Sequence, residues 1–156
     1  MKTIHVKKGQ VIQVPGEVQT KAYYVELGLL RSYVIDQKGR EYIFMFAPEG
    51  WLIADSSPPE VPGELFIDAL EDSTLKVFEK GTEHNNDDRP KLIKRLGVLQ
   101  KRVIQLMSAS AIERYEHFID TYPNITQRVP QRMIASYLGI TPEALSKVKG
   151  EKARGK

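Results

Sequence analysis

The chain has 156 residues, of which 41% are hydrophobic and 28% are charged. This length suits one domain, or one domain with a small appendage, and the composition excludes a disordered or collagen-like chain. Cysteine is absent, which excludes disulfides and thiolate metal sites, and the three histidines lack metal-ligand spacing. No apolar run approaches the roughly 20 residues of a membrane-spanning helix, and the N-terminus has no apolar core for a secretion signal. We therefore expect a cytoplasmic protein with no metal centre and no membrane partner.

Charge is distributed unevenly along the chain. Residues 1–90 contain 10 Lys or Arg and 15 Asp or Glu, a net charge of −5, whereas residues 91–156 contain 13 and 5, a net charge of +8. A basic half of this kind suggests an acidic partner, and nucleic acid is the usual one. On charge alone, an ordinary solvated basic helix is an equally good interpretation.

The N-terminal half is predicted to form short strands. Runs rich in Val, Ile, Tyr and Phe show partial alternation of apolar and polar residues, and turn residues separate them. Asp36–Gly39 is typical of a hairpin loop. This spacing, with no helical period between strands, predicts a barrel or a two-sheet jelly roll. The predicted strands are Thr3–Lys7, Val11–Val14, Ala22–Leu27, Leu30–Ile35, Glu41–Ala47, Trp51–Ala54, Leu65–Leu70 and Thr74–Glu79.

A heptad pattern follows Pro90 and predicts a long helix over residues 90–107. Its a/d positions, at spacings of 4, 3, 4 and 3, are Leu92, Leu96, Leu99, Val103 and Leu106. Such a seam lets two helices pack along one stripe, and Ile93, Ile104 and Met107 widen the apolar face. The alternative is a single amphipathic helix lying on its own barrel, because the seam covers little more than two heptads. Both hold if different stripes face the two partners, so we expect a homodimer with two-fold symmetry.

Two further helical regions are predicted. Residues 108–122 form an amphipathic segment that ends at Pro123. In residues 127–150, Pro130 can begin a helix and Gly139 can close it in the left-handed conformation.

A last helix is predicted to begin at Thr141, a good N-cap residue that precedes Pro142. Leu145 and Val148 form its buried stripe, and the small Ala135 lies where the two helices would approach closely. These features are typical of a helix-turn-helix, with a simple helical hairpin as the alternative.

Nearly the whole chain resembles the bacterial Crp/Fnr-type transcription regulators. The likeness to their output module lies in AIERYEHFIDTYPNITQRVPQRMIASYLGITPEALSKVK, residues 111–149. The likeness to their cyclic-nucleotide-binding-like sensor barrel lies in KKGQVIQVPGEVQTKAYYVELGLLRSYVIDQKGREYIFMFAPEGWL, residues 7–52. The resemblance implies an α+β protein with a double-stranded β-helix, or jelly-roll, barrel in residues 1–86. Connecting and dimerisation helices would occupy residues 87–122, and a helix-turn-helix module residues 123–156.

The resemblance implies a transcription regulator without enzymatic activity. Its partners would be double-stranded DNA, a second copy of the chain and RNA polymerase. The homodimer would insert two recognition helices into successive major grooves, and the barrel would bias the orientation of the two modules through the long helix. A jelly-roll module that binds a small ligand or a protein, with an inactive DNA-binding region, is the alternative.

The resemblance also implies which residues contact DNA. In the family, bases are read from the exposed side of the first turns of the recognition helix, which here holds Pro142, Glu143 and Lys147. Glu can accept a hydrogen bond from cytosine and Lys can donate to guanine, whereas Pro offers only shape or methyl contact. The residues placed for phosphates are Arg132, Thr141, Ser146 and Lys149.

Two departures from the family pattern concern the ends of the chain. Only residues 151–156 follow the predicted recognition helix, where Gly150 and Gly155 weaken any extension, so no wing follows it. Strand-like sequence begins at Thr3, where the family has a first helix. The chain therefore resembles a member trimmed at both ends.

Neither cAMP nor cGMP is expected to bind, and no other cofactor is indicated. Binders in this family carry Gly-Glu-Leu and then an Arg-Ser or Arg-Thr pair, whose Arg grips the cyclic phosphate. The segment Gly63–Leu65 reads Gly-Glu-Leu, but residues 69–73 resemble the stretch that follows the Arg-Ser pair in the family. In that alignment, Gly63 and Glu64 stand where the family has Arg and Ser. No Arg lies between Arg40 and Arg89, and burying a phosphate among acidic residues without a cation would be costly. We interpret residues 63–65 as a turn that leads into a strand.

Overall fold

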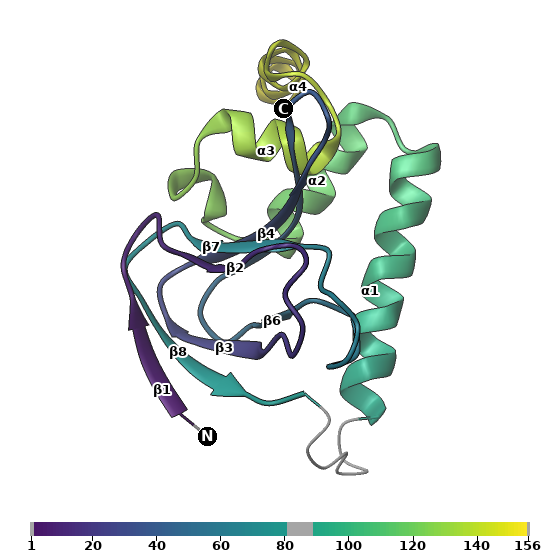
Figure 1. The fold of residues 1–156 in the computed structure, drawn as a ribbon. Coiled ribbons are helices and arrows are strands. Elements are labelled where there is room, and N and C mark those ends of the chain that lie inside the picture. Colours follow the sequence, from purple (N-terminus) through teal and green to yellow (C-terminus); the bar gives the residue numbers. More distant parts are fainter. Residues whose placement is uncertain (1, 81–88, 156) are drawn as a thin grey trace. The chain divides into compact units, whose positions relative to one another are not determined.

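The computed structural model describes residues 2–80 and 89–155, with only the backbone of residues 89–92 described. The chain folds as two compact units, Met1–Glu83 and His84–Lys156. The first is built from strands and the second from helices (Figure 1). The predicted boundary at residues 86 and 87 lies outside the described residues.

The strand unit consists of two antiparallel sheets of four strands each. Their strand orders are β1-β8-β3-β6 and β2-β7-β4-β5. The edge strands are β1 and β6 in one sheet and β2 and β5 in the other, so the described residues do not form the closed barrel that the sequence also allowed. The strands are β1 (Lys2–Val6), β2 (Val11–Gln13), β3 (Ala22–Leu27), β4 (Leu30–Ile35), β5 (Glu41–Ala47), β6 (Leu52–Ala54), β7 (Phe66–Ala69) and β8 (Ser73–Phe78).

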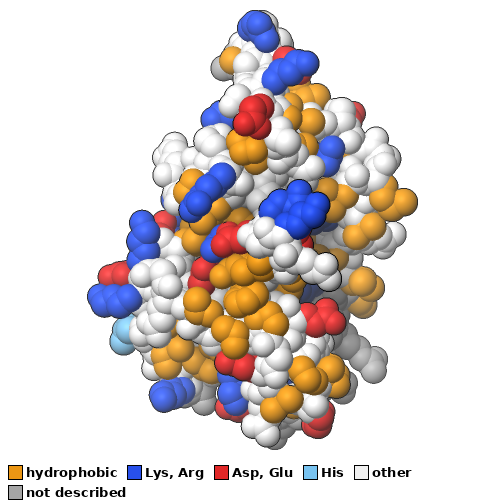
Figure 2. Space-filling view, turned by 45° about the horizontal axis from the view of Figure 1, so that its top comes forward, with side chains coloured by type: hydrophobic (Ala, Val, Ile, Leu, Met, Phe, Trp, Pro, Cys, Tyr) orange, Lys and Arg blue, Asp and Glu red, His pale blue; other side chains and the backbone are white. Residues whose placement is uncertain are grey.

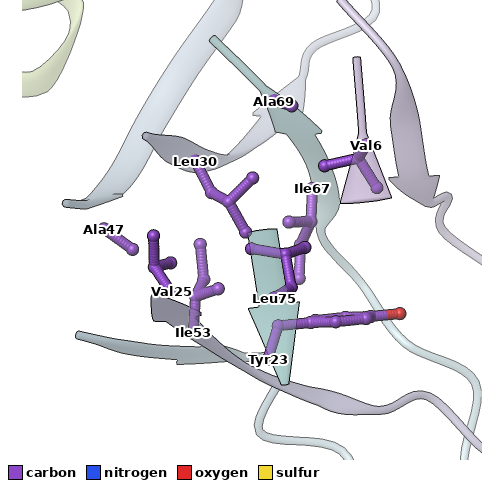
Figure 3. Packing of buried hydrophobic residues seen from close by; sticks show 9 residues of the cluster. All are labelled: Val6, Tyr23, Val25, Leu30, Ala47, Ile53, Ile67, Ala69 and Leu75. Atoms are coloured by element: carbon purple, nitrogen blue, oxygen red, sulfur yellow. The ribbon is translucent and has the colours of Figure 1, made fainter. Parts of the chain in front are cut away.

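The core of this unit lies between the two sheets. Alternate residues along each strand point inward, because successive side chains of a strand face opposite sides. One sheet contributes Val6, Tyr23, Val25, Ile53 and Leu75, and the other contributes Leu30, Ala47, Ile67 and Ala69. Figure 3 shows these nine side chains gathered between the strands that carry them.

The predicted hairpin at residues 36–39 is confirmed. It joins β4 to β5, which pair from Leu30 with Ala47 to Ile35 with Glu41. The Asp36 carboxylate accepts hydrogen bonds from the backbone N–H groups of Lys38, at 2.8 Å, and Arg40, at 2.9 Å. An Asp side chain that binds the backbone two residues ahead stabilises such a turn.

A buried ion pair crosses the sheet that contains β4 and β7. Nε of Arg31 lies 2.9 Å from Oδ1 of Asp68, and both side chains are at most 10% exposed. Nη1 of Arg31 lies 2.6 Å from Oε2 of the more exposed Glu41. The guanidinium also lies 4.1 Å from the centroid of the Tyr33 ring. Arg31 thus has two carboxylate partners and an aromatic ring, which compensate for the cost of burying its charge.

The helical unit contains α1 (Arg89–Ser108), α2 (Ala111–Thr121), the short 3-10 helix η2 (Ile125–Gln127), α3 (Gln131–Leu138) and α4 (Pro142–Arg154). Its centre holds three aromatic rings, because Phe118, Tyr122 and Tyr137 lie with ring centroids 5.2 to 5.6 Å apart. Within the part of the chain that the structure describes, no helix is long and apolar enough to cross a membrane.

Several helix ends differ from the prediction, and three of the differences have a clear local cause. α2 begins at Ala111 rather than at 108, because Ser110 and Glu113 form a capping box. Pro130 is the N-cap of α3 and not part of its first turn. α4 continues through Gly150 to Arg154, because a single glycine weakens a helix without ending it.

Candidate functional site

The turn between α3 and α4 is fixed by its backbone. Gly139 ends α3 in the left-handed conformation, with φ 69° and ψ 32°. The N–H of Ile140 then donates to the carbonyl of Ala135 at 3.1 Å, which is a Schellman-type closure of the helix. The hydroxyl of Thr141 accepts a hydrogen bond from the N–H of Ala144 at 3.1 Å and caps α4. Both end residues therefore act as the sequence predicted.

The two helices pack through small and apolar residues. Ala135 and Leu138 of α3 are buried, as are Leu145 and Val148 of α4. In a helix, residues three apart lie on the same face, so the spacing of Leu145 and Val148 directs one stripe of α4 inward. The opposite face of α4 therefore points away from the unit.

That outward face carries the residues predicted to read bases. Pro142, Glu143 and Lys147 are all exposed, and so is Ser146. Neither Glu143 nor Lys147 makes a hydrogen bond or ion pair with another described residue. Figure 2 shows basic and acidic side chains side by side at the tip of the helical unit, where α4 lies. This face thus offers a donor and an acceptor to a polar partner.

The residues predicted to bind phosphate differ in their exposure and in the hydrogen bonds they already make. Arg132 on α3 and Thr141 at the turn are exposed, and Thr141 already uses its hydroxyl as an acceptor for the helix cap. Lys149 is only half-buried, and its Nζ donates to Oε1 of Gln131 at 3.1 Å. Arg132 and Ser146 are therefore available without rearrangement, whereas Lys149 has to leave Gln131 to bind a phosphate.

The predicted seam on α1 is only partly exposed. Leu96 and Val103 are 65% and 55% exposed, Leu99 is half-buried and Leu106 is 43% exposed. The side chain of Leu92 lies outside the described residues. Ile93 and Met107, which the sequence placed at the margin of the seam, are 70% and 82% exposed. The unpartnered apolar face is therefore centred to one side of the heptad seam.

The other side of α1 packs on its own helical unit. A small pocket near the end of α1 is lined by Arg102, Gln105 and Leu106 together with residues of α2 and α3. Nη2 of Arg102 donates to the carbonyl of Tyr137 at 3.1 Å, and its guanidinium lies 3.8 Å from the centroid of the Tyr137 ring. Nη1 of Arg114 on α2 donates to the carbonyl of Leu138 at 2.8 Å. These two arginines bind the last carbonyls of α3, where the negative end of the helix dipole favours cations.

His117 lies in the same pocket, and its pKa is lowered. Partial burial is the main cause, and the nearby positive charge of Lys101 adds to it, while Asp120 acts in the opposite direction. Its Nε2 lies 3.4 Å from Oγ1 of Thr121. Among the described residues, no cluster of His and carboxylate side chains could hold a metal ion.

Known proteins provide an independent comparison. No family model matches the chain. Two curated relatives, both named anaerobic regulatory protein, come from Aggregatibacter actinomycetemcomitans and Haemophilus influenzae. They are 28% and 26% identical over 170 and 174 aligned residues and cover 93% of this chain. The chain spans 64% of the length of each relative.

Solved structures decide the fold. A CRP/FNR-family transcriptional regulator from Thermus thermophilus matches 99% of this chain and 87% of its own, with a TM-score of 0.78 and 21% identity. FixK2 from Bradyrhizobium japonicum matches 99% of this chain and 85% of its own, with a TM-score of 0.77 and 20% identity. The chain has the Crp/Fnr fold. The Crp/Fnr resemblance seen in the sequence is thus confirmed, and the matched proteins are named as regulators.

Sequence reasoning missed the two arginines of this Crp/Fnr-like helical unit. Arg102 and Arg114 bind carbonyls 35 and 24 residues away in sequence, and no local pattern indicates such contacts. The capping box at Ser110 and Glu113 could have been predicted from the sequence, since Ser-x-x-Glu before an apolar run is a known pattern at helix N-termini.

Proposed function

We propose that this chain is a transcription regulator that binds double-stranded DNA as a homodimer. The observation that carries the proposal is the outward face of α4, where Glu143 and Lys147 are exposed without partners among the described residues. Glu143 would accept from cytosine N4 and Lys147 would donate to guanine N7 or O6. Pro142 would contribute shape, while Arg132, Thr141, Ser146 and Lys149 would hold phosphates and fix the register.

A homodimer would form along α1. Ile93, Leu96, Val103 and Met107 leave an apolar stripe exposed, and such a stripe is unfavourable in water unless a partner covers it. A second copy of α1 would bury it and place two α4 helices on one duplex. Arg102 would transmit the position of α1 to the recognition unit because it joins α1 to the end of α3 directly.

The strand unit would act as the sensor part, and its strand order favours a jelly roll. The proposal includes a sensor barrel in residues 1–86, connecting and dimerisation helices in residues 87–122 and a helix-turn-helix module in residues 123–156. Regulation through RNA polymerase belongs to it as well. Arg31 is already bound to Asp68 and Glu41. The sequence has no Arg between Arg40 and Arg89, and so none follows Gly63–Leu65 into β7. Both points support the expectation that cAMP and cGMP do not bind. Isothermal titration calorimetry with either nucleotide tests this expectation, and a micromolar affinity would contradict it.

The salt dependence of DNA binding tests the proposal. Fluorescence anisotropy with a labelled duplex of random sequence gives the binding constant at several salt concentrations. A working interface predicts a steep loss of affinity with salt, with a logarithmic slope of about −0.9 for each phosphate contacted. Arg132→Ala should reduce the slope by about one unit, whereas the charge-matched control Lys38→Ala on the exposed hairpin should not change it. A flat salt dependence in the unaltered protein would instead favour a binding module without DNA function.

A further inference from the structure

A buried polar cluster lies inside the strand unit and contains none of the residues proposed to bind DNA. Gln13, Thr20 and Asp55 are 2%, 5% and 4% exposed. Lys80 completes the cluster, because its Nζ donates to Oγ1 of Thr20 at 2.6 Å and to the carbonyl of Ser57 at 3.1 Å. Buried polar groups of this kind are costly unless they are paired, so their arrangement calls for a physical explanation.

The Asp55 carboxylate accepts hydrogen bonds from three backbone N–H groups. Oδ1 accepts from Ser57 at 2.8 Å, and Oδ2 accepts from Glu64 at 2.7 Å and from Leu65 at 2.8 Å. Nε2 of Gln13 is a fourth donor and lies 3.5 Å from Oδ2. Burial alone would raise the pKa of Asp55, but these hydrogen bonds outweigh burial, and the pKa is lowered. The carboxylate is therefore held as an anion.

The space beside Gly63 is tightly packed. A Cβ added at Gly63 would lie 3.0 Å from Cγ2 of Thr20, 3.2 Å from Oδ2 of Asp55 and 3.3 Å from Nε2 of Gln13. Nε2 of Gln13 is itself fixed by donation to the carbonyl of Leu65 at 2.9 Å. Backbone N–H groups that converge on one point form an anion-binding concavity, and here the Asp55 carboxylate occupies it.

We propose that Asp55 is an internal ligand. The N–H groups of Ser57, Glu64 and Leu65 form a cradle for a small carboxylate, and the chain fills this cradle with its own side chain. Lys80 supplies the nearby positive charge. The Asp55 carboxylate therefore joins the end of β6 to the start of β7 without any molecule from solution, and the intact strand unit does not bind small anions there. This inference concerns the strand unit alone and does not depend on DNA binding.

Chemical rescue tests the proposal. Asp55→Gly removes a group with the shape of acetate, and Asp55→Ala removes one with the shape of formate. Trp51, the only tryptophan, lies next to β6 and reports thermal unfolding of this unit by fluorescence. Each variant should lose about 5–10 °C in Tm because buried donors lose their acceptor. Acetate should restore much of the Tm of Asp55→Gly, and formate that of Asp55→Ala, since a ligand that binds the folded state stabilises it.

Asp36→Gly is the matched control. Asp36 also accepts two backbone N–H groups, but on an open hairpin, so acetate should raise the Tm of this variant no more than that of the unaltered protein. An equal response to acetate in Asp55→Gly, Asp36→Gly and the unaltered protein would overturn the proposal. If Asp55→Gly is unfolded, recovery of its circular dichroism on adding acetate, but not equimolar chloride, gives the same answer.

Nuclear magnetic resonance of the unaltered protein gives a result that does not depend on any variant. The amide proton shifts of Glu64 and Leu65 should change together as Asp55 is protonated, at a pH below the ordinary range for Asp. Amide shifts that stay constant through that titration would contradict the cradle.

Discussion

The two units place their charges in opposite ways. The strand unit buries Arg31 and Asp68 against each other and encloses Asp55 among backbone donors. The helical unit keeps Glu143 and Lys147 on the outward face of α4, without partners among the described residues. A buried, paired charge mainly serves folding and conformational specificity, whereas an exposed charge without a partner costs little and is available for recognition. The comparison therefore assigns folding to one set of charges and binding to the other.

The largest effect is expected from breaking the buried pair. Arg31→Ala leaves Asp68 buried without its cation, which should lower the free energy of unfolding by about 3–5 kcal/mol. Urea unfolding followed by Trp51 fluorescence measures this loss. Arg40→Ala removes an exposed ion pair with Asp36 and should cost far less, because solvent screens exposed pairs. Similar losses in the two variants would remove the distinction between buried and exposed charges.

A charge on the apolar face of α1 should separate the proposed dimer. Leu96→Glu places two like charges near each other in the dimer and should raise its dissociation constant by a factor of about 100 or more, or about 2.7 kcal/mol. Sedimentation velocity at several concentrations measures the change. Lys94→Glu, on the opposite face of the same helix, is the control and should remain a dimer. The account of α1 fails if the unaltered protein is monomeric, or if both variants dissociate alike.

Removing a proposed base contact should change recognition without changing stability. Lys147→Ala should leave the free energy of unfolding within about 0.5 kcal/mol, because the side chain is exposed. It should also cost about 1–3 kcal/mol of discrimination at one base position, measured by competition between duplexes that differ at that position. If Lys147→Ala and the unaltered protein prefer the same bases equally, Lys147 does not read sequence.

The smallest effect concerns His117 and pH. Because the pKa of His117 is lowered in the folded state, the unfolded chain binds the proton more readily. Stability should therefore fall as pH decreases through the unfolded pKa of about 6.5 towards the lower folded value. His117→Gln should flatten this slope below about pH 6.5, measured by urea unfolding followed by the far-ultraviolet circular dichroism of the helices.

Local patterns predicted most of the fold. The bounds of β3, β4 and β5 agree with the sequence prediction, because alternation and turn residues such as Asp36 define them locally. The α3 and α4 pair was predicted for the same reason, since Gly139 and Thr141 act on adjacent residues.

Contacts distant in sequence could not be predicted. Arg31 and Asp68 are 37 residues apart, and Gln13 and Asp55 are 42 apart, so only the strand order brings them together. The sequence predicted the exposed face of α1 only approximately. The heptad pattern does not reveal that Arg102 and Leu106 pack on the protein's own helices.

Selection of binding sites from a pool of random duplexes is the most direct test of the assignment of α4 to DNA recognition. The account predicts an enriched sequence with two inverted half-sites whose centres lie about 10 base pairs apart, as two recognition helices of a symmetric dimer require. It also predicts that Glu143→Ala and Lys147→Ala each alter the bases selected within the half-sites. Selection that enriches no sequence at low salt, or half-sites that both variants leave unaltered, would contradict the account.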